Sequence, residues 1–105
     1  MTVSGQDVSP GGIDRLIHEP ARLLIMSYLA VVESADFLFL QSQTGLTFGN
    51  LSSHLSRLEE AGYVGVEKKF VGKKPNTILS LTTTGRQAFE QYRRQMMEML
   101  DEEEA

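Results

Sequence analysis

The spacing of the apolar residues changes at Gly62, and this change constrains the fold more than any other feature of the chain. Before it, apolar side chains recur at intervals of four, three and three, at Leu51, Leu55, Leu58 and Ala61. Such spacing predicts a helix over 48–61 with one apolar face. After it, residues 64–71 alternate in polarity, which is typical of a half-buried strand. A helix is therefore expected to lead directly into a strand.

The strand is expected to return as a hairpin with a basic tip. Residues 72–76 form a cluster of turn residues, and 77–82 are predicted as the second strand. Thr84 is the predicted cap of a long last helix, and Gln87 completes a capping box with it. That helix carries an apolar seam with heptad-like spacing, formed by Phe89, Tyr92, Met96 and Met99.

The N-terminal part of the chain is predicted to hold an arm and two helices. Residues 1–12 contain three glycines and one proline with few large apolar groups, which indicates a flexible arm. Apolar spacing predicts a short helix from Ile13, and Pro20 ends it and begins a second helix that runs to Val32. The second helix is apolar on most sides, so we expect it to pack against both the core and a partner.

A helix–turn–helix unit follows. Asp36 is a suitable N-cap for a short helix over 37–44, Gly45 is suited to end that helix, and Thr47 caps the next one. A helix–turn–helix followed by a hairpin is the winged-helix plan, so we expect an α+β, mostly α fold. It would have three N-terminal helices, a β-hairpin wing and a long C-terminal helix. One domain over 13–100 would lie between the arm and an acidic tail at 101–105.

The charge is unevenly distributed along the chain. The net charge is −4 at pH 7, which by itself does not favour a nucleic acid as partner. Residues 47–86, however, hold six basic and three acidic side chains, whereas both flanking segments are net acidic. Screening limits the reach of a surface charge to about 8–10 Å, so a phosphate backbone would respond to the basic segment. Charge alone also leaves open an ordinary solvated loop.

The helix over 48–61 carries short hydrogen-bonding groups opposite its leucines. Asn can pair with adenine, Arg with guanine or a phosphate and Ser with either, while Gly49 allows a close approach to the DNA backbone. Acidic residues appear only at the C-terminal end of the helix, at Glu59 and Glu60. A merely polar surface helix is the alternative. The residues expected to read a major groove are Thr47, Gly49, Asn50, Ser52, Ser53, Ser56 and Arg57.

The hairpin is expected to contact phosphates or the minor groove beside that helix. Its lysines lie on and around the tip, which Pro75 stiffens, and a solvated turn is the alternative. Arg86 is expected to contact either a phosphate or a neighbouring carboxylate, and the sequence does not separate the two. The hairpin residues assigned to DNA binding are Lys68, Lys69, Lys73, Lys74 and Asn76.

Other classes of function find less support. The chain has no cysteine and two histidines, which is a poor ligand set, so no metal and no cofactor are expected. His54 is interpreted as a partly buried spacer beside the leucines that makes a local hydrogen bond. No paired carboxylates, nucleophile–base set or glycine-rich phosphate loop stands out, so no enzyme is expected. No apolar run approaches the roughly 18 residues of a membrane span, and the lack of cysteine suits a reducing cytoplasm.

Four motifs in order resemble the small winged-helix DNA-binding domain family related to MarR and ArsR regulators. They are GNLSSHL in the second helix of the pair, LEEAGYV at its exit, KKFVGKKPNT across the hairpin and LTTTGRQAF at the start of the last helix. The resemblance covers residues 13–100. Phe48 departs from the family pattern, which commonly has a polar residue there. Its side chain is expected to touch a thymine methyl or to pack locally.

The resemblance implies a homodimer held by the first and last helices, with two recognition helices on one face of duplex DNA. The expected function is a dimeric transcriptional regulator, acting as a repressor on a pseudo-palindromic operator. A protein-interaction module is the alternative. It is favoured by the net acidity and by Leu38 and Phe39, two apolar residues that are expected to be exposed. Larger relatives bind phenolic effectors; this sequence shows no pocket signature for one, and it leaves open whether a small-molecule effector is a partner. Residues expected at the dimer contact are Ile13, Leu16, Ile17, Phe89, Tyr92, Met96 and Met99.

Overall fold

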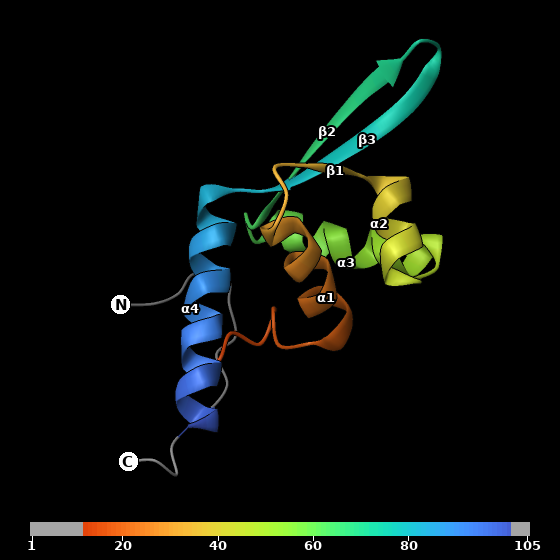
Figure 1. Cartoon of the computed structure of the whole chain (residues 1–105). Coiled ribbons are helices and arrows are strands. Elements are labelled where there is room, and N and C mark those ends of the chain that lie inside the picture. The colour runs from red at the N-terminus through yellow and green to blue at the C-terminus, as the bar shows by residue number, and fades with distance from the viewer. Residues whose placement is uncertain (1–11, 102–105) are drawn as a thin grey trace.

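The computed structural model of the chain describes residues 12–101, which form four helices and a three-stranded sheet (Figure 1). The predicted winged-helix architecture is confirmed. The arm predicted for 1–12 and the tail predicted for 101–105 lie outside the described residues, apart from Gly12 and Asp101. In chain order the elements are α1 (Pro20–Ala30), β1 (Ala35–Asp36), α2 (Phe37–Thr44), α3 (Phe48–Glu60), β2 (Val64–Val71), β3 (Lys74–Leu81) and α4 (Thr83–Leu100).

Side-chain caps set the bounds of α2 and α3, as the sequence predicted. The Asp36 carboxylate accepts a hydrogen bond from the Phe39 amide at 2.7 Å, and the Thr47 hydroxyl accepts one from the Asn50 amide at 3.1 Å. These bonds satisfy amides that the first turn of a helix leaves without partners. Gly45 ends α2 with a φ of 72°. The turn between the two helices is therefore as short as expected.

The prediction of a short helix before Pro20 is wrong. That stretch is a turn in which the Asp14 carboxylate accepts a hydrogen bond from the Leu16 amide at 2.9 Å. Aspartate competes with helix formation by bonding to nearby amides in this way. Pro20 does begin a helix, and the Glu19 carboxylate caps it by accepting from the Arg22 amide at 2.8 Å.

Two further boundaries differ from the prediction. The cap of α4 is Thr82, whose hydroxyl accepts from the Gly85 amide at 2.9 Å, and not Thr84 with its capping box. The returning strand β3 begins at Lys74 because the hairpin turn is only two residues long. Gly72 is the first of these two residues, with a φ of 64°, the conformation that a type II′ hairpin turn requires there.

The sheet has a third strand that the sequence did not reveal. Strand order is β1-β3-β2, all antiparallel, and Ala35 pairs with Leu79. A strand of two residues is too short to show alternation. In the hairpin, Val64 and Leu81 pair at the inner end and are buried, whereas residues 67–75 are exposed on both faces. The outer half of the wing thus stands clear of the body (Figure 1).

The core lies between the sheet and the helices, and the leucine face of α3 is buried in it as predicted. α4 runs away from the wing, and its last residues are exposed (Figure 1). The fully buried side chains of the core are Ile17, Ile25, Met26, Leu29, Leu40, Leu51, Leu58, Tyr63 and Leu79.

The start of α4 is in close contact with Tyr63, which lies between α3 and β2. Gly85 lies against the backbone of Tyr63, and a Cβ atom at position 85 would overlap the Tyr63 carbonyl oxygen. The same oxygen accepts a hydrogen bond from the Thr82 amide at 3.0 Å. The Tyr63 hydroxyl donates to the Asp14 carboxylate, so this one residue joins α4, the N-terminal turn and the exit of α3.

Arg86 joins the start of α4 to the end of α1. Its guanidinium donates to the carbonyl oxygens of Ala30 at 3.2 Å and of Val32 at 3.0 Å. Carbonyl groups at a helix C-terminus lack partners within the helix, and a cation there is favourable. The structure therefore gives Arg86 a third role, different from the phosphate contact and the ion pair that the sequence left open.

The substitution Gly85→Ala is expected to lower the free energy of unfolding by about 1–3 kcal/mol, because the added methyl must displace backbone at Tyr63. Gly49→Ala is the matched control, since a Cβ there meets nothing within 4 Å. It should leave the unfolding free energy unchanged or raise it by up to about 1 kcal/mol. Urea denaturation followed by circular dichroism measures both, and equal midpoints for Gly85→Ala and the wild type would contradict the contact.

Candidate nucleic-acid interface

The buried leucines of α3 direct its polar side chains outward. Gly49, Asn50, Ser53, Ser56 and Arg57 are all exposed, as expected of residues that read a groove. Thr47 is also exposed, but its hydroxyl oxygen already accepts the capping bond from the Asn50 amide. Ser52 is half-buried. Six of the seven predicted positions are thus exposed, on α3 and at its cap.

The polar residues of α3 fall on two sides of the helix. Ser52, Ser56 and Glu59 line a groove between α3 and the wing. Asn50 and Arg57 are seven residues apart, so they share a side, and helical spacing turns that side away from the groove. Glu59 adds a carboxylate to the groove side of α3, near the C-terminal end of the helix.

The lysines of the wing are divided between its two faces. Lys68 lines the groove and so faces α3. Lys69 follows it in the strand and therefore points to the opposite face, and Lys74 pairs with Val71 on that same face. Lys73 lies in the turn. All four are exposed, and Asn76 is half-buried at the wing edge of the groove.

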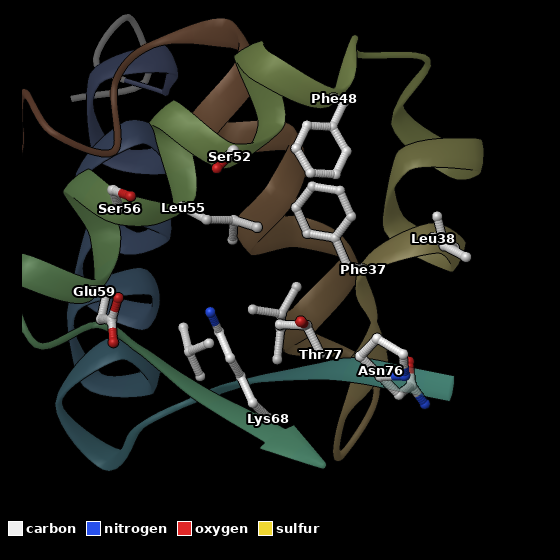
Figure 2. Close-up of a pocket in the computed structure, with 13 residues that line it drawn as sticks. Phe37, Leu38, Phe48, Ser52, Leu55, Ser56, Glu59, Lys68, Asn76 and Thr77 are labelled. Atoms are coloured by element: carbon white, nitrogen blue, oxygen red, sulfur yellow. The ribbon is translucent and has the colours of Figure 1, made fainter. Parts of the chain in front are cut away.

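The groove between α3, the start of α2 and the wing has a volume of about 430 Å³ (Figure 2). Leu55, Val66 and Leu79 contribute its apolar lining. At one end, the rings of Phe37 and Phe48 pack with their centroids 4.9 Å apart and a tilt of 50°. Phe48 therefore packs locally, one of its two expected roles, although its side chain remains 64% exposed.

A buried arginine, which the sequence analysis did not single out, ties α3 to α1. Arg22 is 9% exposed, and its guanidinium lies 3.1 Å from Nδ1 of His54 on α3. The Glu19 carboxylate lies 4.0 Å from the same nitrogen. His54 is partly buried as predicted, but the local hydrogen bond expected for it is wrong, because its ring nitrogen pairs with Arg22 on α1. The sequence signal for this buried contact was a single arginine within the apolar segment 21–26.

The residues expected at the dimer contact lie at different depths. Ile13, Ile17 and Tyr92 are buried within their own chain, and Leu16, Phe89 and Met96 are half-buried against the core. Tyr92 is enclosed, its hydroxyl 2.8 Å from Nδ1 of His18, and burial raises the pKa of that hydroxyl. Met99 is exposed, together with Met97 and Leu100. The free apolar surface of the seam is thus concentrated at the end of α4.

Between Gly12 and Asp101, no group of three or more His, Cys, Asp or Glu side chains is arranged to hold a metal ion. In the same range, no helix combines the length and the apolar character that crossing a membrane requires.

The chain is similar to known proteins over most of its length. The model of the winged helix DNA-binding domain family matches residues 21–100. Uncharacterized protein MJ0432 of Methanocaldococcus jannaschii is 35% identical over 78 residues, which cover 74% of this chain and 85% of that protein.

Solved structures of other proteins have a similar fold. A transcriptional regulator homologue from Pyrococcus horikoshii OT3 superimposes with a TM-score of 0.80 at 28% identity, covering 87% of this chain and 90% of that one. NadR in complex with 4-hydroxyphenylacetate gives a TM-score of 0.69 at 27% identity and covers 86% of this chain, which spans only 63% of NadR. The family expected from the sequence motifs is confirmed: the chain belongs to the winged helix DNA-binding domain family.

Proposed function

We propose that this protein is a sequence-specific regulator that binds duplex DNA as a homodimer and represses transcription by covering its operator. The observation that carries the proposal is the common groove between α3 and the wing, which places the serine face of the helix beside Lys68. The similarity to a transcriptional regulator homologue supports it. The proposal includes a cytoplasmic place of action, which suits a chain without cysteine.

The exposed face of α3 has the chemistry to read bases. An α-helix fits the major groove, where Asn matches adenine, Arg matches guanine and Ser accepts or donates. Asn50 and Arg57 are exposed on one side of α3, with Ser53 between that side and the groove. The leucines beneath hold the helix against the core, so these side chains start from a fixed backbone.

The wing has the chemistry to hold phosphates. Four exposed lysines lie within residues 68–74, and no acidic residue lies among them. Lysine–phosphate contacts release condensed counterions, which makes affinity fall steeply as salt rises. Because the lysines occupy both faces and the turn, the wing can contact both strands that border a minor groove.

Two subunits would match a pseudo-palindromic site. Exposed apolar side chains gather at the end of α4, at Met97, Met99 and Leu100, and such clusters often mark a protein contact. A two-fold dimer built there would place two recognition helices on one face of the duplex, with half-sites about one helical turn apart. Occupation of such a site blocks access to a promoter.

A small-molecule effector would act at the groove described above. Its volume lies within the range of about 300–1,000 Å³ that ligand pockets occupy, and it has an aromatic pair and a lysine on its walls. A molecule seated there would stand between α3 and the wing and would compete with DNA. NadR supports the idea of an effector in so far as its structure contains 4-hydroxyphenylacetate.

A protein-interaction module is the second candidate function. Leu38 is 69% exposed beside the groove, and Phe39 next to it is also exposed. Titration of the protein with promoter fragments and with random duplex at several salt concentrations separates the two. A regulator prefers some sequences and loses affinity with salt, whereas binding without preference, or no binding, favours the interaction module.

Arg57→Ala should relax sequence preference more than it lowers total affinity. Loss of a base-contacting arginine costs about 1–3 kcal/mol on the preferred site and little on other sequences. Arg94→Ala on the exposed surface of α4 removes the same charge and serves as control. Selection of bound sites from random DNA with all three proteins measures the preference. An unchanged preference in Arg57→Ala would remove this residue from the base-reading set.

The double substitution Lys73→Ala, Lys74→Ala should weaken binding to every sequence alike. The slope of log affinity against log salt should become shallower by about two counterions, because two phosphate contacts are lost. The matched control is Arg93→Ala, Arg94→Ala, which removes two charges from α4. A slope that stays at the wild-type value in the wing variant would rule out its lysines as phosphate contacts.

Met99→Glu should shift the protein from dimer to monomer, since a carboxylate would have to be buried at the end of α4. Gln87→Glu, at the other end of the same helix, introduces the same charge and should leave the dimer intact. Sedimentation velocity measures the oligomeric state, and circular dichroism checks that both variants are folded. A dimer that survives Met99→Glu would move the subunit contact elsewhere.

A further inference from the structure

Phe70 is a large aromatic side chain near the end of the wing. Its side chain is 71% exposed, and the strand positions around it, 67–75, are exposed as well. Burying a phenylalanine side chain is worth about 1.5–3 kcal/mol, and most of that is not gained within the chain. The stabilisation remains available to a binding partner.

The strand register shows which way Phe70 points. Side chains alternate along a strand, so Phe70 shares a face with Val66 and Lys68, and both of these line the groove against α3. Pro75 pairs directly opposite Phe70 and therefore lies on that face too. The wing face that meets α3 thus carries an apolar pair, Phe70 and Pro75, toward its tip.

The surroundings of this pair are cationic. Lys68 and Lys69 precede Phe70, Lys73 and Lys74 follow it, and residues 68–76 contain no acidic side chain. An apolar ring among cations complements a polyanion that also offers an apolar surface. The minor groove of duplex DNA provides this combination, with phosphates at its edges and sugar rings and base steps at its floor.

We propose that Phe70 is an apolar wedge that the wing inserts into the minor groove beside the site read by α3, where it partly unstacks one base step. The inference rests on the proposed function and extends it. A wedge costs least at flexible pyrimidine–purine steps, so it adds sequence preference at a position where no side chain reads a base edge. Phe70 is then a specificity-determining residue although its side chain has no hydrogen-bonding group.

Val71 supplies the matched control for this proposal. It is the next residue in the same strand and is 63% exposed, but alternation places it on the other face of the wing. Phe70→Ala and Val71→Ala both remove exposed apolar atoms without changing charge. Phe70→Leu keeps an apolar wedge of smaller size.

The test uses the full chain and a duplex that the wild type selects from random DNA. 2-Aminopurine at the flanking pyrimidine–purine step reports unstacking by a rise in fluorescence. Phe70→Ala should lose about tenfold or more in affinity and should abolish the rise. Val71→Ala should keep both, and Phe70→Leu should keep part of both. The salt slope should stay at the wild-type value in all three, because no phosphate contact is removed.

Three results would overturn the wedge. The first is a Phe70→Ala variant that binds with the affinity and the fluorescence rise of the wild type, and the second is a Val71→Ala variant that loses as much as Phe70→Ala. A loss of affinity in Phe70→Ala without any fluorescence rise in the wild type would show a contact that does not unstack DNA. Unfolding midpoints of the variants exclude a loss of fold. A wild type that binds no duplex overturns the proposed function itself, a result distinct from the first three.

Discussion

Tyr63 holds the arrangement on which the rest of the molecule depends. It lies one residue after the glycine that follows α3 and one residue before β2, with its ring buried in the core. Its hydroxyl donates to Asp14, its carbonyl oxygen accepts from Thr82, and its backbone leaves room for nothing larger than Gly85. The exit of α3, both inner ends of the hairpin and the start of α4 therefore meet at one residue, and these contacts hold the wing next to α3.

A supported base and an exposed tip result from this construction. On the far side of α3 from the wing, the buried Arg22 reaches His54, so α3 is held from α1 as well. The base of the hairpin shares the core with α1 and α3, whereas residues 67–75 of its outer half are exposed. In the proposed function, a fixed backbone under the groups that read bases would reduce the entropy lost on binding. An exposed tip would suit contact with a DNA backbone whose path varies with sequence.

The sequence predicted the elements whose cause is local. The leucine period and the alternation after Gly62 identified α3 and the hairpin, and Asp36 and Thr47 cap helices through bonds to residues three positions on. Features that depend on distant contacts were missed. Three consecutive threonines offer equal local caps, and the contact of Gly85 with Tyr63 selects Thr82 among them. Periodicity likewise marks a buried face without saying what covers it. Side chains expected to meet a second subunit, such as Ile17 and Tyr92, are covered by their own chain.

The wing gives the molecule an electric dipole. Its four lysines lie within residues 68–74, in the part of the hairpin that stands clear of the body (Figure 1), whereas the other residues between Gly12 and Asp101 hold ten acidic and six basic side chains. The positive pole therefore lies at the wing and the negative pole in the body of the molecule. In the field of a polyanion such a molecule turns its positive end forward before contact, which raises the fraction of encounters that begin in a productive orientation. The acidic body also weakens attachment to DNA in any other orientation, so the uneven distribution of charge favours a single orientation of binding.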